Sequence, residues 1–180
     1  VPIRPALAER LSTPEEILEK LQGECALEPK YDGFRVQIHL DKNKEMKKEK
    51  KQQASLIEDF SVGKDTFVRI FSRNLDDTTH MFPEIVAAVQ GLQVDSIILD
   101  GEAIAYDPDT GKFLSFQKTV QRKRKYGVKE KAKEIPLKVF LFDVLYLNGE
   151  PLLNTSFRKR RNKLAEITNK KGQLMLTQQQ

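Results

Sequence analysis

Two long segments rich in β-branched and aromatic residues constrain the fold of this chain most strongly: Ser96–Ala105 and Leu137–Leu147. Both have the composition of buried strands. Residues 34–40 alternate apolar and polar side chains, as a half-buried strand does, and residues 67–71 form a shorter candidate strand. Helices are predicted at Pro83–Gln90, at residues 116–125 and at Phe157–Ile167. Strands of this length between irregularly placed helices predict an α+β fold with a largely antiparallel sheet.

A short helix is predicted near the N-terminus. Thr13 has the character of an N-cap, and Pro14 suits the first helical position. Gly23 is expected to end this helix. The cysteine that follows, Cys25, is the only one in the sequence, which excludes an intramolecular disulfide. Because it lies in an apolar stretch, we expect it to be a packed core thiol.

Composition is that of one soluble domain. The sequence has 180 residues, of which 39% are hydrophobic and 32% charged. No apolar run reaches the roughly 18 residues of a membrane span, so no membrane partner is expected. Lysine and arginine exceed the acids by 31 − 26, a net charge of +5, which permits a polyanionic partner without establishing one.

Positive charge is concentrated in residues 42–51, 122–125 and 158–161. The first of these runs holds six lysines and two glutamates within the biased segment 41–65. A solvated hairpin extension or a flexible loop is the favoured interpretation of that segment, and a DNA contact is the alternative.

The strongest chemical signal is a K-x-D-G-x-R string that begins at Lys30. A lysine nucleophile requires a neutral amine, and Arg35 is a cationic neighbour that favours the neutral form. Gly33 permits a close backbone approach beside a nucleotide. From this string alone, a structural lysine paired with Asp32 in a hairpin turn is an equally good interpretation.

Further motifs make the pattern specific. Residues 28–35 resemble motif I of the covalent nucleotidyltransferases, which comprise ATP-dependent DNA ligases, RNA ligases and mRNA capping enzymes. The others follow in the order of the DNA ligases: residues 4–8 (RPALA), 71–74 (FSRN), 99–102 (LDGE, motif III), 140–143 (FLFD, motif IIIa) and 146–150 (YLNGE). The chain thus resembles the adenylation domain of archaeal and eukaryotic replicative ligases.

This resemblance implies roles for three residues at the base and at the reacting phosphate. Lys30 would attack the α-phosphorus of ATP and carry AMP. Glu28 would help to read the adenine, through its carboxylate or the adjacent backbone, and Phe142 would stack on the ring. Periodicity alone would assign Phe142 to the core, because it alternates with Phe140 and Val144.

Three further roles concern phosphate, ribose and metal. Arg35 and Arg73 would contact ribose and phosphate oxygens. Glu102 would bind the ribose hydroxyl or Mg²⁺, whereas the alternative is a paired carboxylate inside an apolar strand. Arg73 alone is equally consistent with an ordinary surface arginine.

The basic run that includes Arg122 and Arg124 would approach the DNA backbone, with a solvated helix face as the alternative. His39 and His80 show no metal-ligand spacing and are predicted to be structural or solvated.

The family also implies an architecture and partners. We expect the ATP-grasp-like nucleotidyltransferase fold of DNA ligases, incomplete at the C-terminus: residues 1–180 would form a partial adenylation domain with an insertion at 41–65. Motifs IV and V, the OB-fold domain and an N-terminal DNA-binding domain are not found. The partners implied are ATP, Mg²⁺, nicked duplex DNA and, in a full-length protein, a sliding clamp; a monomer in the prokaryotic cytoplasm or the nucleus is expected.

Two alternatives stay open at this point. One is an RNA ligase or a capping-type nucleotidyltransferase. The other is a non-catalytic module that binds nucleotide or DNA, because every retained motif residue would also serve passive AMP binding.

Overall fold

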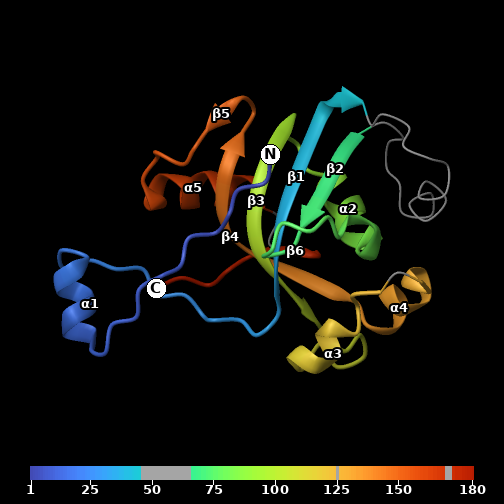
Figure 1. The fold of residues 1–180 in the computed structure, drawn as a ribbon, viewed down its shortest axis with the longest axis horizontal. Helices are drawn as coiled ribbons and strands as arrows, with labels where there is room; N and C mark the ends of the chain where they lie inside the picture. Colours follow the sequence, from blue (N-terminus) through green and yellow to red (C-terminus); the bar gives the residue numbers. More distant parts are fainter. Residues whose placement is uncertain (46–65, 125, 169–171) are drawn as a thin grey trace.

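The structure is a computed structural model that describes residues 1–45, 66–124, 126–168 and 172–180 (Figure 1). Its centre is a sheet with the strand order β2-β1-β3-β4-β5, and β6 pairs with the remaining part of the β4 edge. The strands are β1 (Phe34–Glu45), β2 (Thr66–Phe71), β3 (Ser96–Ala105), β4 (Leu137–Leu147), β5 (Glu150–Pro151) and β6 (Leu174–Leu176). All pairs are antiparallel except β4 with β6, which confirms the predicted α+β class.

The helical elements differ in how closely they follow the prediction. They are α1 (Pro14–Lys20), the 3₁₀ turn η3 (Thr79–Met81), α2 (Pro83–Gln90), α3 (Phe116–Val120), α4 (Val128–Glu134) and α5 (Phe157–Ile167). The bounds of α2 and α5 are as predicted. The helix expected at 116–125 is shorter, because among the described residues 116–124 only 116–120 are helical. Helix α4 was not predicted.

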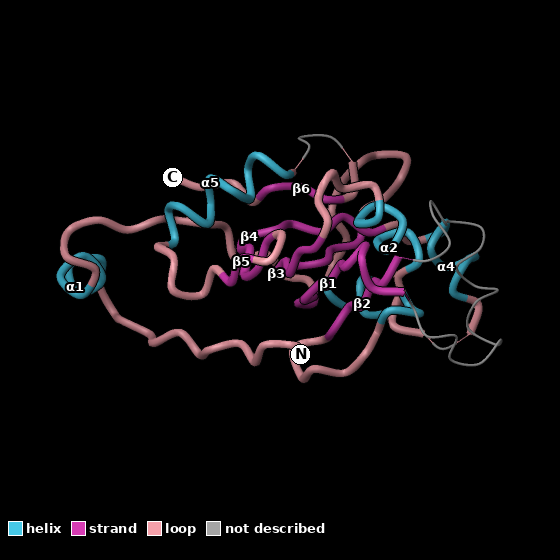
Figure 2. Tube along the Cα trace, turned by 90° about the horizontal axis from the view of Figure 1, so that it is seen from above, coloured by secondary structure: helices cyan, strands magenta, loops and turns pink. Residues whose placement is uncertain are grey.

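One face of the sheet holds the hydrophobic core. Val36 and Ile38 of β1, Leu99 of β3 and Leu141 of β4 are all at most 1% exposed. Helix α2 and the buried Leu164 of α5 pack in the same cluster. Figure 2 shows α5 on one side of the sheet and the N-terminal segment on the other.

The opposite face of the sheet is polar. Gln37 and His39 of β1 and Asp100 of β3 lie on it, all buried. The N-terminal segment crosses this face: the Ile3 N–H donates to Gln37 Oε1 at 2.7 Å, and Gln37 Nε2 donates to the Ile3 carbonyl at 3.0 Å. The motif residues of β1, β3 and β4 therefore gather on this polar face.

The N-terminal helix begins as predicted, with the Thr13 hydroxyl accepting from the Glu16 N–H at 3.2 Å. Gly23 adopts φ +88°, and its N–H caps the Leu18 carbonyl at 2.7 Å. However, α1 buries none of its residues. The prediction for Cys25 is wrong: it is partly exposed, and Leu27 beside it is 62% exposed. An apolar stretch thus lies at the surface of the described structure.

The segment predicted as an insertion begins on a longer strand than expected. β1 continues to Glu45, which pairs with Thr66 at the start of β2. The remaining residues of this segment, 46–65, lie outside the described residues. No helix in the described part of the chain is long and apolar enough to cross a membrane.

Candidate active site

The turn that carries Lys30 is held against β3 by a close backbone approach at Gly33. A Cβ added to Gly33 would lie 2.2 Å from the carbonyl oxygen of Ala103, so only glycine fits without a shift of the backbone. The Gly33 N–H also donates to Glu102 Oε1 at 3.2 Å. The exposed Lys30 is thereby tied, through the turn, to the motif III carboxylate.

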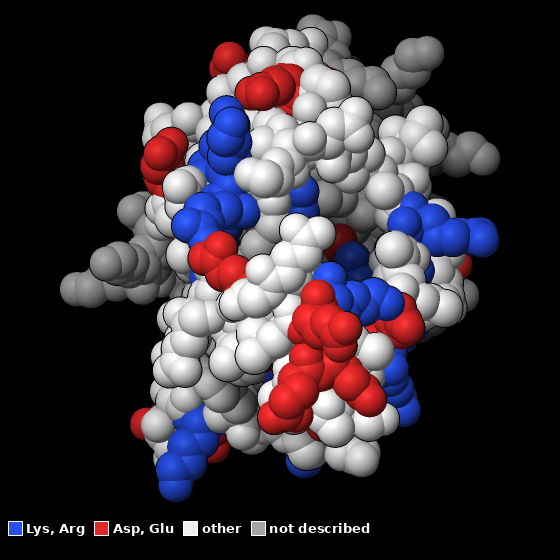
Figure 3. Space-filling model, turned by 90° about the vertical axis from the view of Figure 1, so that its left-hand side faces the viewer, with Lys and Arg blue, Asp and Glu red and all other residues white. Residues whose placement is uncertain are grey.

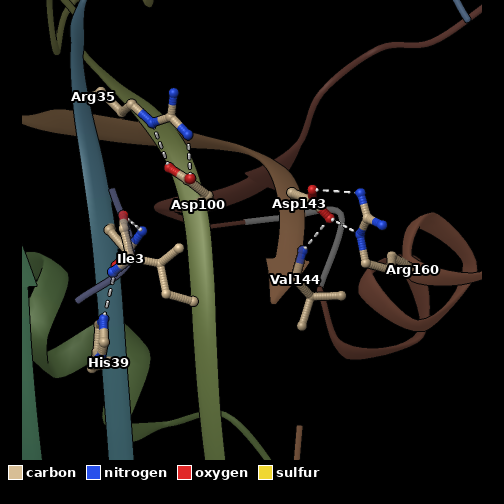
Figure 4. Close-up of polar contacts among 8 residues, drawn as sticks. Ile3, Arg35, His39, Asp100, Asp143, Val144 and Arg160 are labelled. Atoms are coloured by element: carbon tan, nitrogen blue, oxygen red, sulfur yellow. Dashed lines mark hydrogen bonds and ion pairs between the residues drawn. The ribbon is translucent and has the colours of Figure 1, made fainter. Parts of the chain in front are cut away.

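Antiparallel register brings the other motif residues to the same place. Arg35 is the cross-strand partner of Glu102, and Glu102 is the partner of Phe140. Arg35 binds Asp100 through two contacts, with Nε 2.9 Å from Oδ1 and Nη2 on Oδ2 (Figure 4). Its guanidinium carbon lies 5.4 Å from the ring centroid of Phe142. Four of the six residues predicted to contact the nucleotide thus lie around the start of β1: Lys30, Arg35, Glu102 and Phe142.

Burial shifts the pKa of both motif III acids. It raises the pKa of Glu102, against the opposing effects of the Gly33 N–H and of the positive charges of Lys30 and Arg35. Burial likewise raises the pKa of Asp100, partly offset by Arg35 and reinforced by the negative charge of Asp143. Because a desolvated carboxylate gains most from a nearby cation, this polar face favours binding of positive charge.

Phe142 is partly exposed rather than in the core, so a ring could stack on it. Its neighbour Phe140 is buried and stacks on Tyr31, with ring centroids 4.2 Å apart and planes at 20°. Tyr31 thereby fixes the Lys30 turn to β4. Burial raises the pKa of the Tyr31 phenol.

Arg73 lies in the exposed turn after β2. Because Phe71 pairs with Gln37, this turn follows the end of β2 nearest to Arg35. Arg73 makes no hydrogen bond or ion pair with another described residue.

Glu28 has partners that the motifs did not indicate. Its Oε1 accepts from Thr177 Oγ1 at 2.8 Å and lies 3.3 Å from Arg161 Nη1. Arg161 belongs to the basic run 158–161, and Asp100 is part of the LDGE motif; the sequence assigned a role to neither residue. Arg161 is 133 positions and Thr177 is 149 positions from Glu28, so no local sequence signal connects them.

The predicted phosphate contact of Arg122 is wrong. Its side chain is completely buried and forms an ion pair with Glu84 of α2. Its guanidinium carbon also lies 6.0 Å from the Phe82 ring centroid. Arg124, in contrast, is exposed, and its Nε donates to the Gln121 carbonyl at 3.1 Å. The DNA-binding prediction for this run therefore rests on Arg124.

The charged surface is mixed. Figure 3 shows one face with a compact acidic group beside separate basic groups. The acids in the first turn of α1, Glu15 and Glu16, contribute negative charge at this end of the molecule. Within the described ranges, no three His, Cys, Asp or Glu side chains form a cluster that could hold a metal ion. His39 is buried and its Nε2 lies 3.1 Å from Gln37 Oε1, in agreement with a structural role.

Solved structures share this fold. The chain is similar to the ligase domain of M. tuberculosis LigD, with a TM-score of 0.56 and 24% identity over 86% of this chain and 40% of that chain. It is also similar to a mycobacterial DNA ligase D complexed with ATP and MES, with a TM-score of 0.53 and 24% identity over 86% of this chain and 39% of that chain. The architecture is therefore the nucleotidyltransferase fold of a ligase domain.

The sequence specifies the family further. The model of the ATP dependent DNA ligase domain matches residues 5–50 and 60–180, so the chain belongs to that family. It is 48% identical to a probable DNA ligase of Dictyoglomus turgidum over 98% of this chain and 26% of the relative. It is 43% identical to DNA ligase 2 of Thermofilum pendens over 93% of this chain and 24% of the relative. The chain spans about a quarter of the length of these curated relatives.

Proposed function

We propose that this chain forms the AMP-binding and lysine-adenylation part of an ATP-dependent DNA ligase, with Lys30 as the nucleophile. The observation that carries the proposal is the close packing of the Gly33 backbone against Ala103, together with its hydrogen bond to Glu102; we call these contacts the Gly33 clamp. It holds the Lys30 turn against Glu102, beside the ion pair of Arg35 and Asp100. A nucleophile gains rate when its surroundings hold it in place before the reactant binds.

The reaction of Lys30 is a nucleophilic substitution at phosphorus. The neutral amine attacks the α-phosphorus of ATP, so a P–N bond forms and the P–O bond to pyrophosphate breaks. Pyrophosphate leaves with the electron pair of that bond, and the amine proton passes to solvent. In the full ligase reaction, the AMP would then activate the 5′-phosphate of nicked duplex DNA, and the 3′-hydroxyl would displace it.

The cationic side chains suit the anionic part of ATP. Two donor nitrogens of Arg35 are engaged by Asp100, which leaves Nη1 for a phosphate or ribose oxygen. The exposed Arg73 would add a second guanidinium. Such preorganised donors stabilise charge that develops in the transition state.

The carboxylates and aromatic rings suit the rest of the nucleotide. Phe142 offers a partly exposed ring for the adenine, although Arg35 lies near it and would have to share that space. Glu102 would bind the ribose hydroxyl or Mg²⁺. One carboxylate is sufficient for this ion, which commonly takes its remaining ligands from phosphates and water.

The DNA substrate would lie against the exposed basic side chains, of which Arg124 is the candidate. A sliding-clamp contact and a monomeric state are proposals for the whole protein on family grounds. Phosphate contact by Arg124 would be independent of DNA sequence.

Labelling of the full-length gene product with nucleotides labelled at the α-phosphate tests this function. We expect covalent labelling by ATP that requires Mg²⁺ and is not seen with GTP. Glu102→Gln should lower it strongly, whereas Glu130→Gln, an exposed acid on α4, should leave it unchanged. Preferential labelling by GTP would instead indicate a capping-type enzyme, and no labelling at all would indicate a passive binding module.

A further inference from the structure

Two residues from distant parts of the chain meet at the Glu28 carboxylate. Arg161 is on α5, and Thr177 directly follows β6. The Thr177 hydroxyl donates to Glu28 Oε1 at 2.8 Å, and Arg161 Nη1 lies 3.3 Å from the same oxygen. Arg161 also donates to the Thr177 hydroxyl at 2.5 Å and to the Thr177 carbonyl. These contacts form one connected network.

Both donors bind the same oxygen of Glu28. Its other oxygen, Oε2, has no hydrogen bond from any described residue. The side chain of Glu28 is 27% exposed, while that of Arg161 is 9% exposed. The carboxylate is therefore held by one oxygen and keeps the second one free to accept a hydrogen bond from a ligand.

Backbone hydrogen bonds also hold the segments that carry Thr177 and Glu28 in place. The Thr177 N–H donates to the Leu141 carbonyl of β4 at 3.0 Å. The residue before Glu28, Leu27, exchanges two backbone hydrogen bonds with Gln180, at 2.9 and 3.1 Å. Both the backbone and the side chain of Glu28 are thus fixed. A fixed carboxylate loses little rotamer entropy when it binds a ligand.

We propose that Arg161 and Thr177 are positioning residues that orient Glu28 to select a purine with a 6-amino group. The inference rests on the proposed function, in which this site binds the adenine of ATP. The free carboxylate oxygen can accept a hydrogen bond from a 6-amine. A 6-oxo purine such as guanine would place an oxygen lone pair against it, which leaves two acceptors unsatisfied.

Comparison of two nucleotides distinguishes a positioning role of Arg161 and Thr177 from a purely structural one. ATP carries the 6-amine, whereas purine riboside triphosphate carries hydrogen at that position and is otherwise the same. The experiment measures kcat/KM for covalent labelling of the full-length gene product with each nucleotide. The enzymes compared are the wild type, Arg161→Lys, Thr177→Val and the control Arg158→Lys.

The control residue is matched to the test residue. Arg158 lies three positions before Arg161 on α5, but its side chain is 73% exposed and pairs with the exposed Glu24. Thr177→Val removes the hydroxyl while it keeps the shape and the backbone carbonyl that Arg161 binds. If Arg161→Lys fails to fold, as a thermal melt would show, Thr177→Val still decides the question.

We expect Thr177→Val and Arg161→Lys each to lower kcat/KM for ATP roughly tenfold, the usual effect of one lost hydrogen bond, and to leave the value for purine riboside triphosphate within about twofold. Arg158→Lys should change neither value. Equal losses with both nucleotides in folded Thr177→Val would overturn the proposal. Absence of labelling in the wild type would instead refute the proposed function, and this inference with it.

Discussion

Replacing Gly33 by alanine should disable the site while the rest of the sheet stays intact. The new Cβ would lie 2.2 Å from the Ala103 carbonyl oxygen and 2.9 Å from Ile104 Cγ1. Ala103 cannot move away, because it is paired with Phe34 on one side and Val139 on the other. The Gly33 backbone must therefore move by roughly 1 Å to restore an ordinary contact.

That movement has two energetic consequences. Overpacking of a tight site costs about 1–3 kcal/mol. The hydrogen bond from Gly33 to Glu102, already 3.2 Å long, would also be lost, which adds about 1 kcal/mol. We expect Gly33→Ala to lower the free energy of unfolding by about 3 kcal/mol. Because Lys30 precedes the turn, a displacement of about 1 Å should slow its adenylation roughly 100-fold.

Urea denaturation measures the first effect, and the rate of labelling by ATP measures the second under conditions where the variant is folded. Gly91→Ala is the matched control. Gly91 has ordinary helical backbone angles, and its added Cβ would lie 3.4 Å from the nearest atom, so stability should change by less than about 1 kcal/mol. Unchanged stability and labelling in Gly33→Ala would refute the clamp.

Three further perturbations test other parts of the account. Arg122→Met should destabilise the fold by about 3 kcal/mol in urea denaturation, because it leaves the buried Glu84 without its partner; a loss below about 0.5 kcal/mol would contradict the buried ion pair. Arg124→Ala should leave stability unchanged and reduce the salt dependence of DNA binding by about one phosphate contact, and an unaltered slope would exclude Arg124 from the interface. Burial lowers the pKa of His39 from 6.5 to about 4. As the pH falls, the unfolded protein therefore takes up a proton at His39 before the folded protein does. The stability from neutral His39 is therefore complete above pH 6.5 and should decline by up to about 3 kcal/mol towards pH 4, a loss that His39→Gln should lack in denaturation at several pH values.

The regular elements were largely predictable, because local signals specify them. Ser96–Ala105 and Leu137–Leu147 are strands with the predicted bounds, and Pro83–Gln90 begins with a proline suited to a helix start. Helix α4 was missed because its lysine-rich sequence shows little apolar character. Only Val128 and Ala132, four residues apart, are buried in it.

Runs of charged or apolar residues did not reliably predict which side chains are buried. A run of four basic residues indicates a solvated surface, yet Arg122 within it is buried. Its partner Glu84 is 38 positions away, and local sequence does not show such a pairing. Cys25 illustrates the opposite error, because a short apolar stretch indicates burial only when another element covers it.

The sequence predicted which residues form the candidate site, but it did not predict the contacts between them. The motifs predicted Lys30, Arg35, Glu102 and Phe142 as site residues, and the structure places these four near the start of β1. The bond from Arg35 to Asp100 and the network around Glu28 depend on strand register and on the path of the C-terminal segment. These are long-range properties that spacing alone does not determine.

The most direct test of the central claim is the position of the AMP adduct. The full-length gene product would be incubated with ATP and Mg²⁺, digested and mapped by mass spectrometry, alongside Lys30→Ala and the control Lys112→Ala, which changes another exposed lysine. We expect one acid-labile phosphoramidate, on Lys30, that is absent from Lys30→Ala and unchanged in Lys112→Ala. An adduct on another lysine, or full labelling of Lys30→Ala, would contradict it.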